Sequence, residues 1–96
     1  MPQYVYIVEC ADETLYTGYT TDVGRRLHQH NAGEGASYTA GRRPVQLRYV
    51  EYHPSRGDAL SREHEIKSLT RAQKERLVPE EKQQIGVRFG STSQDP

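Results

Sequence analysis

The side chains most able to carry chemistry in this sequence are one glutamate, one arginine, one histidine and two tyrosines, and Glu63 is the most unusual of them. It lies three residues after Leu60 and three before Ile66, within the apolar stripe of a predicted helix. A carboxylate that faces a core is costly unless it is paired or coordinates a cation. Three interpretations of Glu63 follow: it turns into solvent at the helix edge, it pairs with Arg62 or Lys67, or it holds a hard metal ion such as Mg²⁺.

Arg26 and His30 are four residues apart, so they project from the same face of a predicted helix. Arginine offers a planar fork of donors that suits phosphate, and histidine can donate or accept a proton. Tyr6 and Tyr16 lie on the two strands of a predicted hairpin, which can bring their phenols together. A phenol is a poor base unless a nearby cation favours the phenolate. The ordinary interpretations are a solvated helix face and packing on the sheet.

The strands that position these residues are marked by β-branched and aromatic runs, which predict strands over residues 4–10, 15–20 and 45–52. Gly18 within the second run indicates a bulge or a close approach of the backbone to another group. Residues 31–44 contain three glycines and a proline, so they are predicted to form a loop.

The helices are marked by their caps. They are predicted over residues 23–31, from 58 to about 69, and in a short segment that begins near residue 70. Thr21-Asp22 and Asp58 are the N-cap candidates of the first two helices, and Thr70-Arg-Ala-Gln73 resembles a capping box. Pro79 is expected to stop the third helix, and residues 90–96 to fray. The order β-β-α-β-α-α favours an α+β fold, a small three-stranded and mainly antiparallel sheet flanked by helices.

Length and composition exclude several classes of protein. A chain of 96 residues, 33% hydrophobic and 27% charged, makes one small domain, predicted over residues 1–89. One cysteine excludes a disulfide framework and a Cys-based zinc site. The sequence contains neither a membrane-spanning run of ~18–20 apolar residues nor a signal peptide, which predicts a soluble cytoplasmic protein.

The 13 basic and 13 acidic residues cancel, but residues 14–50 carry five arginines against two acids. This stretch is either a phosphate-handling surface or an ordinary solvated loop.

The order and spacing of the candidate residues resemble the GIY-YIG nuclease family. Tyr4-Val5-Tyr6 stands where that family has Gly-Ile-Tyr, and Tyr16-Thr17-Gly18 stands where it has Tyr-Ile-Gly, with Tyr16 following Tyr6 by ten residues. Arg26 follows Tyr16 by ten residues and His30 follows it by fourteen, as the family's helix arginine and histidine do. Ala59-Leu-Ser-Arg-Glu63 looks like the family's late helix, which carries a metal-binding glutamate.

The likeness covers roughly residues 3–70. Residues 30–44 are similar to the small stand-alone branch of the family (YhbQ-like), and also to the catalytic subunit of the eukaryotic flap and junction nuclease. Tyr4 and Thr17 depart from the two motifs. Tyr19 stands where nucleotide-excision-repair incision enzymes carry a lysine that is thought to assist the tyrosine base.

The resemblance implies a metal-dependent endonuclease that hydrolyses phosphodiester bonds, with Mg²⁺ or Mn²⁺ as the cofactor. It assigns Glu63 to the metal, Arg26 to the phosphate oxygens and Tyr6 to the general base. Tyr16 would orient water or phosphate, and His30 would assist proton transfer. The substrate implied is nucleic acid, with DNA favoured over RNA, selected by structure rather than sequence in repair or recombination.

Further contacts to nucleic acid are expected from residues of the basic stretch: Arg25, Tyr38, Arg42 and Arg43. A monomer without membrane contacts is favoured, and a protein partner is left open. The alternative function is a nucleic-acid-binding module of the same fold that does not cut. A small interaction adaptor would explain the arginine-rich loop but not a glutamate within an apolar stripe.

Overall fold

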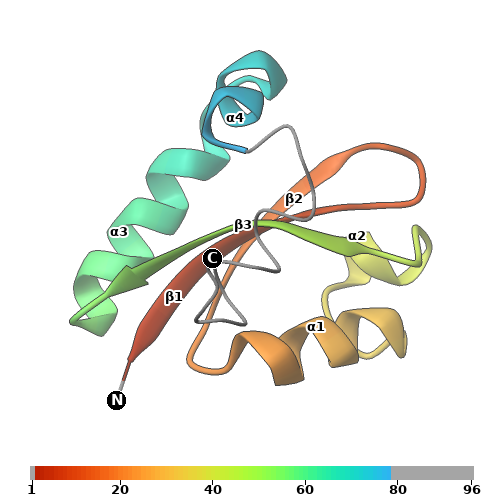
Figure 1. Ribbon diagram of the computed structural model, residues 1–96, viewed down its shortest axis with the longest axis horizontal. Helices are drawn as coiled ribbons and strands as arrows, with labels where there is room; N and C mark the ends of the chain where they lie inside the picture. The colour runs from red at the N-terminus through yellow and green to blue at the C-terminus, as the bar shows by residue number, and fades with distance from the viewer. Residues whose placement is uncertain (1, 79–96) are drawn as a thin grey trace, which may run out of the picture.

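A three-stranded antiparallel sheet in the order β2-β1-β3 organises the molecule, and helices cover both of its faces (Figure 1). The computed structural model describes residues 2–78. Within them the elements are β1 (Gln3–Glu9), β2 (Leu15–Thr20), α1 (Val23–Asn31), α2 (Ser37–Ala40), β3 (Gln46–His53), α3 (Arg56–Lys67) and α4 (Arg71–Leu77). The predicted α+β class and antiparallel sheet are confirmed. The prediction of one uninterrupted loop over residues 31–44 is wrong, because the four-residue helix α2 lies within it.

The central strand β1 divides the core into two clusters, because successive side chains of a strand point to opposite faces of the sheet. Val5 and Ile7 face α3 and pack on its buried residues Ala59 and Ile66. Tyr6 and Val8 face the opposite side of the sheet. There they form a second cluster with Cys10, Val45, Tyr16 of β2 and Leu27 of α1. The face that carries Tyr6 is therefore the face covered by α1.

The helix caps follow the sequence signals at α1 and α4. The Asp22 carboxylate accepts a hydrogen bond from the backbone N–H of Arg25, and Gly33 has a positive φ of 83° just after the end of α1. At α4, Thr70 and Gln73 exchange hydrogen bonds of 2.9 and 3.2 Å and form the predicted capping box.

The beginning and the apolar stripe of α3 differ from the prediction. The cap is Ser55 rather than Asp58, because the Ser55 hydroxyl accepts from the Asp58 backbone N–H at 3.1 Å, and the helix begins at Arg56. Asp58 instead lies in the first turn, where a negative charge favours the helix dipole. The stripe is narrower than predicted, since Leu60 is 38% exposed whereas Ala59 and Ile66 are fully buried.

Smaller differences concern the ends of elements. β3 spans Gln46–His53 instead of residues 45–52, and α3 ends at Lys67, although Leu69 still packs against the core. α4 ends at Leu77, and the expected stop at Pro79 lies outside the described residues. The predicted domain end at residue 89 and the frayed tail over residues 90–96 also lie outside them.

Candidate active site

The two most buried candidates, Tyr6 of β1 and His30 of α1, form a direct pair. The Tyr6 hydroxyl lies 2.8 Å from Nε2 of His30, and the two rings meet edge to face with their centroids 5.8 Å apart. Both side chains belong to the buried interior, with exposed fractions of 2% for Tyr6 and 0% for His30. The last turn of α1 thus brings a ring nitrogen onto the phenol that the resemblance assigns as general base.

Two glycines make room for this pair. A Cβ atom added at Gly18, the cross-strand neighbour of Tyr6, would lie 2.3 Å from the Tyr6 hydroxyl oxygen. A Cβ at Gly35 would lie 2.3 Å from Nδ1 of His30. The predicted close approach at Gly18 is therefore confirmed. The role of Gly35 was missed, because nothing in a glycine-rich loop marks which glycine packs on a ring.

Thr39 of α2 is a second residue that the sequence analysis missed, and it contacts the other ring nitrogen of His30. Its hydroxyl oxygen lies 2.7 Å from Nδ1 of His30 and 3.0 Å from the carbonyl oxygen of Ala36. Thr39 is fully buried. Both nitrogens of the His30 ring are thereby hydrogen-bonded to side chains from two different elements.

Tyr16 of β2 lies against the other side of His30, with ring centroids 5.6 Å apart and an interplanar angle of 70°. It stacks on Tyr38 at 5.7 Å and 23°, and the guanidinium carbon of Arg42 lies 3.9 Å from the centre of the Tyr38 ring. The Lys67 ammonium lies 5.9 Å from the Tyr16 ring centre. These contacts attach α2 to the rim of the site and bring Tyr16, Tyr38 and Arg42 together.

Burial and nearby charges set the protonation of the pair. Burial raises the pKa of Tyr6 to about 12, and a hydrogen bond and positive charge from Arg26 act against this rise, whereas the charge of Glu63 adds to it. Burial and then the Arg26 charge lower the pKa of His30. Both groups are therefore neutral at pH 7 in the resting protein, and Arg26 is the cation that favours a phenolate.

Glu63 reaches the site from α3, where its charge acts on Tyr6, and the structure identifies its ion-pair partner. Its carboxylate lies 3.2 Å from the Lys67 ammonium, one turn along the helix, and its side chain is 19% exposed. Glu63 thus pairs with Lys67 at the edge of the core and not with Arg62, whose guanidinium binds Glu51 and Glu65.

The donor set around Glu63 restricts the kind of metal that fits. Among residues 2–78, no three His, Cys, Asp or Glu side chains lie close enough together to hold a metal ion. A single carboxylate cannot form a dedicated cage. It does fit a hard divalent ion that keeps several waters and takes further ligands from substrate phosphates.

The basic residues proposed for the rim differ in their partners. Arg42 donates to the Asp12 carboxylate at 3.0 Å and to the Tyr38 carbonyl at 2.7 Å, which fixes its guanidinium beside α2. Arg43 donates to the Ala40 carbonyl at 2.9 Å and is otherwise exposed. Arg25 is exposed in the first turn of α1.

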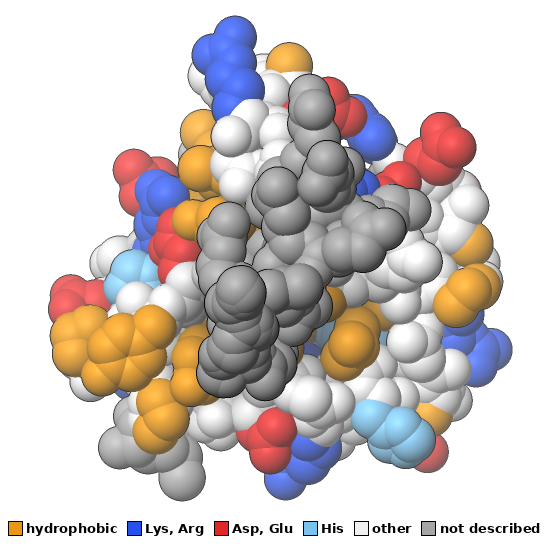
Figure 2. Space-filling view, in the orientation of Figure 1, with side chains coloured by type: hydrophobic (Ala, Val, Ile, Leu, Met, Phe, Trp, Pro, Cys, Tyr) orange, Lys and Arg blue, Asp and Glu red, His pale blue; other side chains and the backbone are white. Residues whose placement is uncertain are grey.

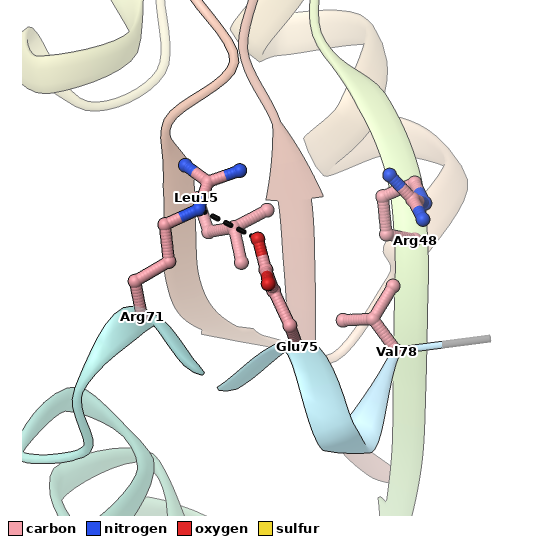
Figure 3. A pocket seen from close by; sticks show the side chains of 5 residues that line it. All are labelled: Leu15, Arg48, Arg71, Glu75 and Val78. Atoms are coloured by element: carbon pink, nitrogen blue, oxygen red, sulfur yellow. Dashed lines mark hydrogen bonds and ion pairs between the residues drawn. The ribbon is translucent and has the colours of Figure 1, made fainter. Parts of the chain in front are cut away.

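A separate pocket of about 320 Å³ lies beside α4 (Figure 3). It is lined by Leu15, Arg48, Arg71, Glu75 and Val78, none of which belongs to the candidate site. Arg71 pairs with Glu75 at 2.7 Å and donates to the backbone carbonyl of Glu13. The contact with Glu13 attaches α4 to the β1–β2 hairpin, and Leu15 and Val78 belong to the core cluster on the α3 face of the sheet.

The fold and the site together define a small α+β domain in which the buried phenol of one hairpin tyrosine is grouped with the second hairpin tyrosine, an arginine and a histidine of one helix, and a glutamate of a later helix. The chain belongs to the GIY-YIG family, because the family model described as the GIY-YIG catalytic domain matches residues 2–76. This is a family of nucleases that act on nucleic acid and generally use divalent metal ions. None of the helices within residues 2–78 is long and apolar enough to cross a membrane.

Proteins similar to this chain are small. A UPF0213 protein of Haloquadratum walsbyi is 68% identical over 77 residues, which cover 80% of this chain and 86% of the relative. A UPF0213 protein of Staphylococcus haemolyticus is 54% identical over 77 residues, covering 80% and 94%. These matches confirm the predicted likeness to the small stand-alone branch of the family.

Two solved structures resemble the fold. The solution NMR structure of a UPF0213 protein from Bacillus halodurans has a TM-score of 0.51 and 43% identity, covering 96% of this chain and 90% of that chain. The solution NMR structure of a protein from E. faecalis has a TM-score of 0.55 and 36% identity, covering 100% and 95%.

Proposed function

We propose that this protein is a metal-dependent endonuclease that hydrolyses phosphodiester bonds in nucleic acid. DNA is the favoured substrate, chosen by its structure rather than its sequence, as in repair or recombination. The observation that carries the proposal is the buried Tyr6–His30 pair, at 2.8 Å, with Arg26 and Glu63 both acting electrostatically on the same phenol. Any buried phenol needs a hydrogen-bond partner, but a tyrosine used only for packing does not need an arginine and a glutamate acting on it as well.

The proposed chemistry moves one proton through the pair. Tyr6 passes its phenolic proton to Nε2 of His30 and takes a proton from the attacking water, so that the hydroxide adds to phosphorus while the bond from phosphorus to the leaving oxygen breaks. The leaving oxygen takes a proton from solvent, and His30 returns its proton through Tyr6 to solvent, which restores the resting pair. Arg26 lies beside the phenol and binds the non-bridging phosphate oxygens, whose charge grows in the transition state. Tyr16 orients water or phosphate next to His30.

Glu63 is the residue that would hold Mg²⁺ or Mn²⁺. When bound, such an ion stabilises the charge that develops on the phosphate and on the leaving oxygen. The Lys67 ammonium neutralises the Glu63 carboxylate when no metal is present, so metal binding has to compete with this ion pair.

Arg25, Tyr38, Arg42 and Arg43 are proposed to contact the nucleic-acid backbone around the site. On the face seen in Figure 2, Lys and Arg side chains are interspersed with Asp and Glu side chains, in keeping with the zero net charge of the chain. Attraction of a polyanion then depends on the local arginines of α1 and the α2 segment and not on a general positive field.

The experiment is cleavage of single-stranded, duplex, flap and four-way-junction DNA and of an RNA hairpin, each with Mg²⁺, Mn²⁺ or EDTA. At least one substrate is expected to be cut with a metal ion and none with EDTA, and Tyr6→Phe, which removes only the hydroxyl, is expected to abolish cleavage. Cleavage that persists in EDTA would contradict the metal-dependent mechanism.

The second candidate function is a nucleic-acid-binding module that does not cut. The Glu63–Lys67 ion pair favours it, because the pair uses the carboxylate without any metal. Tight binding of a branched substrate, with no cleavage under any metal condition, would support this function over the nuclease.

A further inference from the structure

We propose that Thr39 is a positioning residue that fixes which nitrogen of His30 carries the proton, so that Nε2 is left free to accept the proton of Tyr6. The inference rests on the proposed nuclease function, but it makes a claim about the resting protein that can be measured without substrate. Its basis is a chain of three buried hydrogen bonds from Tyr6 to His30, from His30 to Thr39 and from Thr39 to the Ala36 carbonyl.

The direction of this chain follows from counting protons. The Ala36 carbonyl has no proton, so its 3.0 Å contact with the Thr39 hydroxyl is a hydrogen bond only if Thr39 donates. A hydroxyl has a single proton, so a Thr39 that donates to Ala36 accepts from His30 at the 2.7 Å contact. Nδ1 of His30 then carries the proton.

The other ring nitrogen is assigned by the same count. In a neutral imidazole, one nitrogen donates and the other accepts. With the proton on Nδ1, Nε2 has a free lone pair, and the 2.8 Å contact is a hydrogen bond in which the Tyr6 hydroxyl donates. The opposite tautomer would place the ring proton towards Tyr6 and leave Nε2 unable to accept.

Burial makes this arrangement stable in one form. His30 and Thr39 are both fully buried, so water cannot replace a lost partner, and an unpaired polar atom there is costly. Gly35 packs directly on the ring, since a Cβ at this position would lie 2.3 Å from Nδ1 of His30. Gly35 and Thr39 thus both lie against the Nδ1 side of the ring.

The decisive measurement is the tautomer of His30 by ¹⁵N NMR, in the full chain at pH 7.5 without metal or nucleic acid. Long-range ¹H–¹⁵N spectra distinguish a protonated from a free ring nitrogen, and the signals of His30 are assigned by their loss in His30→Asn. We expect Nδ1 to be protonated and Nε2 to be free. A wild-type protein with the proton on Nε2 would overturn the proposal.

The matched variants are Thr39→Val, Thr39→Ser and Thr17→Val. Thr39→Val keeps the shape and removes the hydroxyl, so the Nδ1-protonated form should no longer dominate, whereas Thr39→Ser should keep it. Thr17 is the control, because it is a second buried threonine whose hydroxyl has no hydrogen-bond partner among residues 2–78. An unchanged His30 tautomer in Thr39→Val would contradict the inference, and so would the same change in Thr17→Val.

Single-turnover cleavage of the best substrate gives the functional readout. Thr39→Val should reduce the rate about 10–100-fold, the usual effect of losing the group that orients a functional histidine, with an unchanged Kd for substrate. Thr39→Ser should stay within about threefold of wild type. An altered tautomer with an unchanged rate would refute the positioning role.

If wild type cuts nothing, the proposed nuclease function fails, and the NMR result still decides the tautomer. Should Thr39→Val not fold, the wild-type and Thr39→Ser spectra decide it.

Discussion

The phenol of Tyr6 is the group that the other residues of the candidate site contact or act on electrostatically. Burial raises its pKa to about 12, Arg26 opposes that rise, and Nε2 of His30 lies 2.8 Å from its oxygen. The sequence analysis noted that a tyrosine is useful as a base only beside a cation. Arg26 provides that cation, and Tyr19, which stands at the position of the lysine in the repair incision enzymes, instead donates to Gln3.

Substitution of Gly18 tests how closely the site is packed. Gly18→Ala places a methyl group 2.3 Å from the Tyr6 oxygen, so the ring must move. We expect loss of cleavage and a fall of about 1–3 kcal/mol in the free energy of unfolding, the usual cost of overpacking. Gly57→Ala is the control, because no heavy atom lies within 4 Å of its added Cβ. Full activity of Gly18→Ala, measured beside urea unfolding, would show that the position of Tyr6 is not critical.

Substitution of Glu63 separates its chemistry from its structural role. Glu63→Gln is expected to abolish metal-dependent cleavage while changing the free energy of unfolding by less than about 0.5 kcal/mol. The reason is that its ion pair with Lys67 is partly exposed, with the lysine 49% and the glutamate 19% exposed, and i,i+4 pairs on a helix contribute little. Urea unfolding without metal and a cleavage assay measure the two effects.

The matched control is Glu65→Gln, the same change on the same helix, at a carboxylate that pairs with Arg62. It should leave both cleavage and stability near wild type. A loss of several kcal/mol in Glu63→Gln would mean that the carboxylate is structural, and retained cleavage would remove the proposed metal ligand.

At the scale of elements, the segment that contains α2 contacts both His30 and Tyr16. Thr39 of α2 contacts His30, Tyr38 of α2 stacks on Tyr16, and Arg42, two residues after α2 ends, lies over the Tyr38 ring. In the proposed function, Thr39 therefore serves the proton transfer, and Tyr38 and Arg42 serve the binding of nucleic acid.

The binding role of this segment is tested with Arg42→Ala combined with Arg43→Ala. We expect weaker binding of nucleic acid and a salt dependence of affinity reduced by up to roughly two phosphate contacts, with a smaller effect on single-turnover cleavage of bound substrate. Arg56→Ala combined with Arg76→Ala removes the same charge from α3 and α4 and is the control. If affinity and salt slope stay unchanged while cleavage collapses, the two arginines act on the reacting phosphate and not on binding.

At the scale of the whole molecule, Tyr6 lies on the face of the sheet that α1 covers, and α3, the helix that carries Glu63, packs on the opposite face. On the α3 face, Glu51 of β3 accepts hydrogen bonds from Arg62 of α3, from Tyr49 and from His53. Burial alone would raise the pKa of Glu51, but these three partners outweigh it and lower the pKa to about 2. The network therefore ties α3 to the sheet through one ionised carboxylate.

This network predicts how global stability depends on acid. The folded-state pKa of Glu51 lies below its ordinary value of 4.5, so the stabilisation is complete above pH 4.5 and is lost as the pH falls from 4.5 towards 2. Glu51→Gln should cost about 1–3 kcal/mol at pH 7 and reduce the fall in stability over that interval. Urea unfolding at several pH values measures it, with Glu65→Gln as the control. A parallel pH dependence in Glu51→Gln and wild type would assign the acid sensitivity to other groups.

The sequence by itself predicted every element except α2, and through the family resemblance it named five candidate residues of the site, because these signals depend on local spacing. Caps such as Asp22 and Thr70, the alternation of β1 and the four-residue spacing of Arg26 and His30 depend on neighbours within one turn or one strand. The resemblance to the family was carried by the same short spacings. Errors arose where a local signal had a competitor one turn away, as with Ser55 and Asp58 at the start of α3.

Only the tertiary structure decided how those residues are protonated and paired. The contact of Tyr6 with His30 joins residues 24 apart, and that of His30 with Thr39 depends on a helix that forms in a glycine-rich loop. Glu63 was expected within the apolar stripe, but the rotation of α3 on the sheet places it at the edge of the core beside Lys67. Burial, pKa and hydrogen-bond direction depend on which elements pack together in space, and spacing along a chain does not specify that packing.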